Sequence, residues 1–199
     1  LCSGQELGLN DDLYPGAEVY GLLDLPADTV PGTDICKVTG LDDYLFDISI
    51  TANRPDCQSV LGIAREVAAA LDKPLNMPAT NYTQSEYTDP DLSIRVEAPE
   101  LCPRYLGHYV RNITPGQSPR WMRRQLALCG LRSISNVVDI TNYVMLEIGQ
   151  PMHAFDMDTL ESRQIIVRRA APEETITTLD GKEFRLTENN LVICDGSKP

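Results

Sequence analysis

The clearest pattern of hydrophobic and polar positions lies in residues 60–71 and is helical. Apolar residues recur there at the three- and four-residue spacing that gathers side chains on one helix face; they are Val60, Ile63, Ala64, Val67, Ala68 and Leu71. Asp56 or Ser59 can cap the start of this helix, and Lys73-Pro74 stops it. Residues 76–92 are polar and nearly free of aliphatic side chains, which is typical of a linker.

The segment SPRWMRRQLALCG, residues 118–130, predicts a second helix. Ser118 can cap it, Pro119 suits its first position, and Gly130 suits its end. One face of this helix is expected to carry Met122, Leu126 and Cys129.

The segment ISNVVDITNYVMLEIGQP predicts a third helix, which Gly149 and Pro151 end. The residues expected to face inward are Val137, Ile140, Val144 and Ile148. Asp139 and Asn142 lie three residues apart on the more polar side. Periodicity predicts that both are solvated, and the alternative is that both point into a pocket beside the helix.

Strands are predicted in LSIRVE, CPRYLGHYVRNI, RQIIVRR and LVIC. Within TITTLDGKEFRL, Asp180-Gly181 is a favourable two-residue hairpin turn. Helices followed by clustered strands favour an α+β fold over a doubly wound sheet: a helical N-terminal segment, then a mixed helix and β-sheet domain with antiparallel strands.

The composition is that of an ordinary globular protein, with 42% hydrophobic and 23% charged residues among 199. There is no run of apolar residues long enough to predict a transmembrane helix, and the first residues lack the order of a signal peptide. Both ends interrupt structured-looking segments, so we interpret the chain as an excised fragment.

The net charge of −12 argues against broad binding of a phosphate backbone. The richest basic cluster is predicted to form a solvated helix face, with a nucleic-acid contact as the alternative; it consists of Arg120, Arg123, Arg124 and Arg132. The six cysteines form no C-x-x-C pair and lie in apolar runs, as small core residues do. A reducing cytoplasm is therefore favoured over a secreted glycoprotein domain, the alternative that the Asn81 and Asn112 sequons suggest.

Phosphate-binding glycine loops, the H-E-x-x-H helix and the G-x-S-x-G elbow are absent from the sequence. With His108 and His153 as the only histidines, a multi-histidine metal site is implausible, so no metal ligands are expected. A pair of catalytic carboxylates among Glu147, Asp156 and Asp158 stays an alternative to a solvated acidic loop.

His153 lies in GQPMHAFD, directly after the third predicted helix. Pro151 fixes its own φ and holds Gln150 extended, so the backbone that leads to His153 is stiff. The imidazole could orient a substrate or a water. From these residues alone, a histidine that ties down the loop through Asp156 or a carbonyl is favoured over one that acts on a substrate.

Three segments, ITANRPDCQSVLGIAREVAA, LCPRYLGHYVRNI and LRSISNVVDITNYVMLEIGQPMHAFD, resemble the beta subunits of bacterial phenylalanyl-tRNA synthetases. The similarity runs through essentially the whole chain in consistent order. It implies that residues 1–75 end a preceding helical domain, 76–92 form a linker, and 93–199 are the N-terminal part of the tRNA-editing domain, truncated at the C-terminus.

The resemblance implies an activity and a site. Members of this family hydrolyse tyrosine mischarged onto phenylalanine tRNA, and their aminoacylation site lies on the alpha subunit. The residues that match the editing pocket are His153, which would orient the ester or a water, and the substrate-binding positions Pro151, Met152, Thr141 and Asn142. The acidic residue that recognises the tyrosine hydroxyl would follow Pro199, so this chain would carry about half of the pocket.

The resemblance also names partners: the alpha subunit, phenylalanine tRNA mainly through other regions, and tyrosine in the pocket, with no membrane. No cofactor is expected in this fragment, while the parent enzyme would use ATP and Mg²⁺. A structural or interaction module of the synthetase without independent catalysis is the competing hypothesis.

Overall fold

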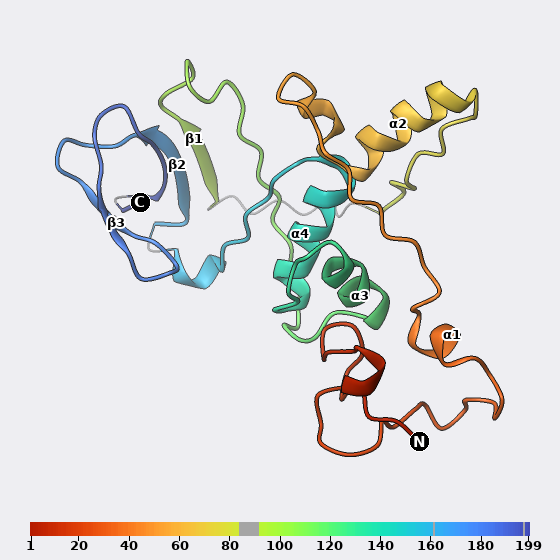
Figure 1. Cartoon of the computed structure of the whole chain (residues 1–199). Helices are drawn as coiled ribbons and strands as arrows, with labels where there is room; N and C mark the ends of the chain where they lie inside the picture. Colours follow the sequence, from red (N-terminus) through yellow and green to blue (C-terminus); the bar gives the residue numbers. More distant parts are fainter. Residues whose placement is uncertain (84–91, 161, 197) are drawn as a thin grey trace. The chain divides into compact units, whose positions relative to one another are not determined.

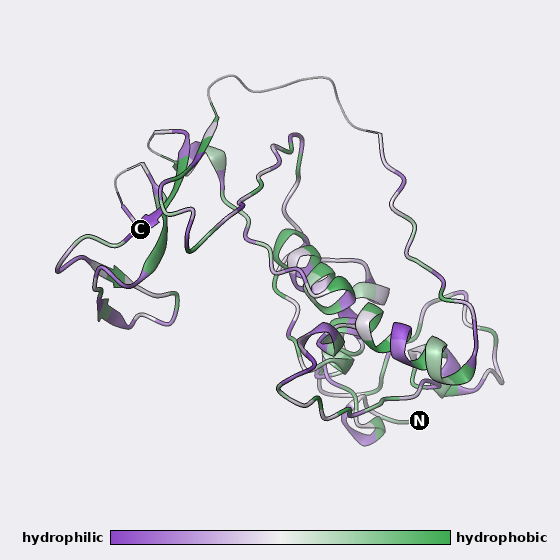
Figure 2. Ribbon diagram, turned by 90° about the horizontal axis from the view of Figure 1, so that it is seen from above, coloured by the Kyte–Doolittle hydropathy of each residue, from purple (hydrophilic) through white to green (hydrophobic). Residues whose placement is uncertain are grey.

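The computed structural model describes residues 1–83, 92–160, 162–196 and 198–199 (Figure 1). In chain order the elements are η1 (Gln5–Leu7), α1 (Ile35–Thr39), η2 (Pro55–Cys57), α2 (Val60–Leu71), β1 (Ser93–Val96), α3 (Arg120–Leu128), α4 (Asn136–Ile148), η3 (Met157–Thr159), β2 (Gln164–Arg169), β3 (Thr175–Thr177), β4 (Glu183–Arg185) and β5 (Leu191–Asp195). Figure 2 shows hydrophobic residues on helices and strands alike. This combination of helices and mixed sheets confirms the α+β class.

The chain forms two compact units, and each is built from two stretches of sequence. The first unit comprises Leu1–Thr80 and Thr114–Ala154, and the second comprises Asn81–Ile113 and Phe155–Pro199. The α-helices belong to the first unit and the strands to the second. Helices α3 and α4 thus belong to the same compact unit as residues 1–80. The expected linker lies partly, at 84–91, outside the described residues.

The second unit is built around strand β2. In the three-stranded sheet, in the order β1-β2-β5, β1 runs parallel to β2 and β5 runs antiparallel to it. Three consecutive apolar residues of β2, from Ile165 to Val167, are buried, as in a strand covered on both faces. The core around it consists of Ile166, Ala170, Val192 and Cys194, with Leu186 packed against them.

Strands β3 and β4 form the predicted hairpin. The Thr178 N–H donates to the Lys182 carbonyl at 2.9 Å, and the Gly181 N–H donates to the Thr178 carbonyl at 2.8 Å. Gly181 has a φ of +78°, a conformation that glycine adopts without steric cost. The turn at Asp180-Gly181 is confirmed.

The strand predicted in CPRYLGHYVRNI is wrong, because residues 102–113 contain no strand. β propensity describes how a residue fits a paired, half-buried surface, and no strand among the described residues pairs with this segment. Leu106 and Val110 are 67% and 63% exposed. Gly107 instead approaches Ile94 of β1 so closely that an added Cβ would lie 2.2 Å from its Cδ1.

In the first unit, helix α2 follows its sequence signals. The Ser59 hydroxyl accepts a hydrogen bond from the Gly62 N–H at 3.0 Å, and Asp72 ends the helix with a φ of +50°. Gly62 is buried against η2, where an added Cβ would lie 1.9 Å from the Asp56 carbonyl oxygen. The predicted helix, with Ser59 as its cap, is confirmed.

Helix α3 differs from prediction at its start. Pro119 is the N-cap and no side chain caps the helix, so the prediction that Ser118 caps it is wrong. The Ser118 hydroxyl donates instead to the Asp139 carboxylate. Met122 and Leu126 are buried as expected, while Cys129 is exposed.

The arginines of α3 hold backbone carbonyls of the N-terminal residues. Arg120 donates to the carbonyls of Val38 and Thr39 at 2.9 and 3.0 Å. Its guanidinium also lies 4.3 Å from the centre of the Tyr14 ring. Because these carbonyls end helix α1, the cation satisfies groups that the helix itself leaves unpaired.

The next two arginines act in the same way. Arg123 donates to the Asp11 carbonyl at 2.9 Å, and Arg124 donates to the Gly40 carbonyl and pairs with Asp43. The prediction that this cluster is a solvated face is therefore wrong for all but the exposed Arg132. The arginines join the N-terminal segments to α3.

Candidate functional site

Helix α4 and the loop after it carry every residue that the sequence assigns to the site. The Ser135 hydroxyl accepts from the Val138 N–H at 3.4 Å at the start of the helix. Gly149 ends it with a φ of +79°, and its N–H donates to the Met145 carbonyl. Because Gly149 adopts the left-handed conformation that commonly ends helices, the chain turns there and GQPMHAFD begins.

The loop residues Pro151, Met152 and His153 are exposed, Met152 by 51%. They close the first unit, which ends at Ala154. The Gln150 side chain donates to the Pro151 carbonyl at 3.1 Å, so the loop is braced just before His153. An exposed imidazole in this position is accessible to a large substrate.

Thr141 and Asn142 are half-buried in the middle of α4 and differ in what their polar atoms do. The Thr141 hydroxyl donates to the Val138 carbonyl at 2.7 Å, which leaves its oxygen only as an acceptor. The Asn142 amide makes no hydrogen bond within the described part of the chain. It therefore keeps both donor and acceptor capacity for a ligand.

Thr141 and Asn142 lie some distance from the loop that carries His153, measured along the axis of α4. At about 1.5 Å of rise per residue, Asn142 lies about 10 Å from the end of α4. Thr141 and Asn142 lie within α4, whereas Pro151, Met152 and His153 lie in the loop that follows the helix.

Sequence reasoning misjudged Asp139, which is fully buried. Its carboxylate accepts hydrogen bonds from the hydroxyls of Ser118 and Ser133, both at 2.5 Å, and from the Ile134 N–H at 2.9 Å. Burial alone would raise the pKa of this carboxyl, but these hydrogen bonds outweigh it and hold the pKa below its usual value.

The burial of Asp139 explains a second error. Ile140 and Ile148 were expected to face inward, but they are 48% and 45% exposed. The face of α4 that packs inward is therefore rotated toward Asp139 relative to the face that periodicity predicts. The only sequence signal for this was an acidic side chain close to the start of a capped helix.

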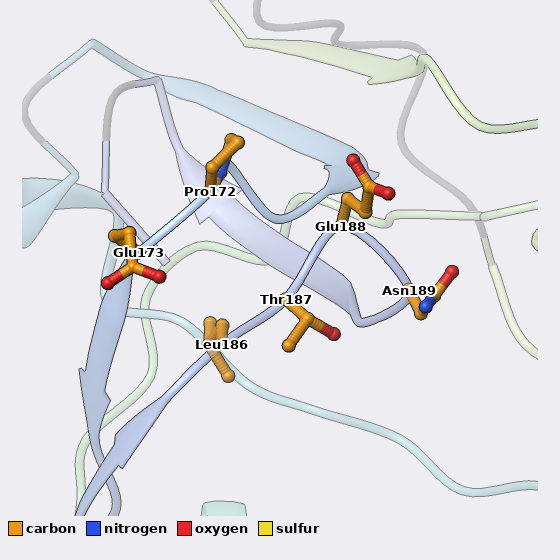
Figure 3. A pocket seen from close by; sticks show the side chains of 6 residues that line it. All are labelled: Pro172, Glu173, Leu186, Thr187, Glu188 and Asn189. Carbon is orange, nitrogen blue, oxygen red and sulfur yellow. The ribbon is translucent and has the colours of Figure 1, made fainter.

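Two surface hollows do not include the candidate site residues. One, of about 220 Å³ in the first unit, is lined by Val60, Gln125, Cys129, Tyr143, Leu146 and Glu147. The other, of about 250 Å³ in the second unit, is formed by two turns (Figure 3); its lining residues are Pro172, Glu173, Leu186, Thr187, Glu188 and Asn189. Neither includes His153, Thr141 or Asn142.

One group of possible metal ligands occurs in the described residues: Asp56, Cys57 and Glu66. The Arg54 guanidinium pairs with both carboxylates, at 2.8 and 2.6 Å. Its hydrogen bond lowers the pKa of Asp56 to about 2. An arginine already supplies the positive charge here, so the group is explained as an ion-pair network of the NRPD motif.

Among the residues that the structure describes, the other acidic and cysteine side chains show no catalytic arrangement. The Asp156 carboxylate accepts from the Asp158 N–H at 3.1 Å and so caps η3. None of the six cysteines is in a disulfide; Cys57 and Cys194 are buried, while Cys2, Cys36 and Cys129 are exposed, contrary to the expectation of core residues. Among the described helices, none has the length and apolar character needed to cross a membrane.

Comparison with known proteins shows the class of protein to which this chain belongs. The profile of the B3/4 domain matches residues 101–199. Over its whole length the chain is 48% identical to the phenylalanine–tRNA ligase beta subunit of Moorella thermoacetica and 46% identical to that of Geobacillus kaustophilus. Over 98% of its length it is 48% identical to that of Pectobacterium atrosepticum.

The chain therefore belongs to the family of bacterial phenylalanine–tRNA ligase beta subunits and contains a B3/4 domain. It spans about a quarter of the length of these relatives.

Proposed function

We propose that this chain is the section of a phenylalanine–tRNA ligase beta subunit that contributes to hydrolytic editing of tyrosine mischarged onto phenylalanine tRNA. The observation that carries the proposal is the full-length similarity to such subunits, together with a B3/4 domain at residues 101–199. Aminoacylation, its need for ATP and Mg²⁺, and assembly with an alpha subunit belong to the proposed whole enzyme.

The need for editing follows from the substrate chemistry. A pocket built for phenylalanine rejects an analogue with one added hydroxyl by only about 10². A second, hydrolytic site is therefore required to remove the tyrosine that the first pocket accepts and that becomes attached to the tRNA.

The proposed roles follow from what each side chain has available. His153 is exposed on a braced loop, where its imidazole would orient the ester or the attacking water. The Asn142 amide, which is not engaged within the described residues, would donate to and accept from the substrate. Thr141 would act as an acceptor only, because its hydroxyl proton is used within the helix.

The loop residues before His153 would shape the pocket. Pro151 and Met152 are exposed and apolar, so they can contact an aromatic ring while Pro151 keeps the backbone stiff. This gives the proposed site an apolar wall beside the histidine.

The test is deacylation of tyrosyl-tRNA by the assembled synthetase that contains this chain. We expect His153→Ala to slow deacylation at least tenfold, because the variant loses the side chain that would position the ester or the water for reaction. The matched control is His108→Ala, which removes the other exposed histidine. Unchanged deacylation by the His153 variant would contradict the role given to His153.

A second candidate is a structural module that holds the subunit together without catalysis. The net charge of −12 favours it, since the chain alone has little attraction for tRNA. Calorimetric titration of the chain with tyrosine separates the two candidates. Saturable binding that Asn142→Ala weakens would exclude a purely structural role.

A further inference from the structure

Asp139 is a fully buried carboxylate at the start of the helix that carries the proposed site. Its three hydrogen-bond partners come from two segments: Ser118 precedes α3, while Ser133 and Ile134 follow it. We propose that Asp139 is a positioning residue, which fixes the direction in which α4 presents Asn142 and the loop from Pro151 to His153. This inference rests on the proposed editing function.

The geometry of the helix links Asp139 to the site. Residues three apart lie on the same helix face, so Asn142 follows Asp139 one turn later on that face. A rotation or shift of α4 at Asp139 therefore moves Asn142 directly. Because α4 is one continuous helix up to Gly149, the same shift is carried to the start of the His153 loop.

A neighbouring residue, Asn136, also holds the start of α4 in place. The Asn136 side chain donates to the Thr114 carbonyl at 2.9 Å and accepts from the Gly116 N–H at 3.2 Å. The first turns of α4 are thus bound to the segments on both sides of α3. At the other end of the helix, Gly149 contacts Ser59, where an added Cβ would lie 3.4 Å from the Ser59 Cβ.

Two substitutions of Asp139 separate its hydrogen bonds from its charge: one keeps the hydrogen bonds and the other removes them. In Asp139→Asn, the amide oxygen still accepts from the Ile134 N–H, and the amide nitrogen can donate to both serine oxygens, since a hydroxyl accepts as well as donates. In Asp139→Leu, of similar size, both hydroxyls and one N–H lose their acceptor in a buried place. We therefore expect α4 to keep its position in Asp139→Asn and to shift in Asp139→Leu, while both variants lack the charge.

The experiment measures tyrosyl-tRNA deacylation and phenylalanine aminoacylation by the assembled synthetase. We expect Asp139→Leu to lower kcat for deacylation at least tenfold with a smaller change in KM. We expect the kcat of Asp139→Asn for deacylation to stay within threefold of that of the unchanged enzyme. The rate of aminoacylation, measured on the same samples, should stay within twofold of the unchanged enzyme in both variants. The matched control is Asp28→Leu, which removes an exposed carboxylate of the first unit and should match the unchanged enzyme in both assays.

A double variant keeps the inference testable if the leucine protein does not assemble. Ser118→Ala with Ser133→Ala removes two of the three hydrogen bonds without changing Asp139, and deacylation is expected to fall in the same way. Equal losses in Asp139→Asn and Asp139→Leu would show that charge matters and position does not, which overturns the inference. Normal deacylation by an assembled leucine or double-serine variant would overturn it too.

Including His153→Ala in the same series separates this inference from the proposed function. If His153→Ala leaves deacylation unchanged, or the unchanged enzyme does not deacylate tyrosyl-tRNA, the proposed function fails. If His153→Ala slows deacylation but an assembled Asp139→Leu variant does not, only the positioning role of Asp139 fails.

Discussion

The polar side chains of α4 divide into those that build the structure and those that keep binding capacity. Asp139 accepts three hydrogen bonds and is buried. Thr141 uses its proton within the helix, whereas the half-buried Asn142 has no hydrogen bond among the described residues. A half-buried amide without a partner among the described residues can bind water, and it keeps the capacity to bind the substrate proposed above.

Asn142→Ala should therefore weaken editing with little effect on folding. We expect a loss in kcat/KM for tyrosyl-tRNA deacylation of about tenfold, which corresponds to one lost hydrogen bond of about 1.4 kcal/mol. The thermal unfolding midpoint of the chain should change little, because no intramolecular bond is removed. Asn189→Ala, at an exposed asparagine of the second unit, is the matched control, and a large fall in unfolding midpoint for Asn142→Ala would contradict this assignment.

At the scale of elements, α3 is a basic helix whose cations face carbonyl oxygens. Arg120 serves two carbonyls at the end of α1 and stacks on Tyr14. A planar guanidinium can do both at once, whereas the ammonium of lysine is a compact charge with no flat face. The charge of α3 is therefore used to hold the N-terminal residues in place.

Arg120→Lys should destabilise the chain although it keeps the charge. We expect a loss of about 1–2 kcal/mol in the free energy of unfolding, because two hydrogen bonds to carbonyls and a ring contact are replaced by at most one. Urea unfolding followed by the fluorescence of Trp121, the one tryptophan of the chain, measures it from within α3. Arg132→Lys, at the exposed arginine beyond α3, should be neutral, and equal losses in both variants would contradict the role of Arg120.

Elements with strong local signals could be predicted from the sequence. Helices α2 and α4 are capped by serines and closed by left-handed residues, and the β3–β4 hairpin has its Asp-Gly turn. These signals act over a few residues, so they need no knowledge of the rest of the chain. The candidate site residues followed from family resemblance and stay a prediction.

What could not be predicted depends on contacts between distant residues. The segment 102–113 has the composition of a strand, but strand formation requires a neighbouring strand. Asp139 looked solvated because periodicity describes one helix, whereas Ser118 and Ser133 approach it from outside that helix. The arginines of α3 likewise find acceptors more than eighty residues away in sequence.

At the scale of the whole molecule, the two units use different means of stabilisation. The first unit relies on capped helices, arginine–carbonyl bonds and the small cluster of Leu9, Tyr14 and Ala17. The second unit has a buried central strand and a well-shielded ion pair, in which Arg168 and Glu174 are 19% and 14% exposed and 2.7 Å apart. Such a pair is screened less by water than the exposed pairs elsewhere in the chain.

The Arg168–Glu174 pair should make the stability of the chain depend on pH in acid. The hydrogen bond from Arg168, with a second from the Ala171 N–H, lowers the pKa of Glu174 to about 2. The unfolded chain therefore takes up a proton on this group first as pH falls, and the folded state loses stability between about pH 5 and pH 2. Above that window both states are ionised and the contribution, about 1–2 kcal/mol after allowance for solvent, is complete.

Glu174→Gln should remove this part of the pH dependence. Urea unfolding at pH 6 and pH 3, followed by circular dichroism, should show a smaller loss of stability on acidification in the variant than in the unchanged chain. Arg168→Met should reduce the loss too, since without the guanidinium the pKa of Glu174 returns toward its usual value. If both variants lose as much stability on acidification as the unchanged chain, the Arg168–Glu174 pair is not the source of this pH dependence.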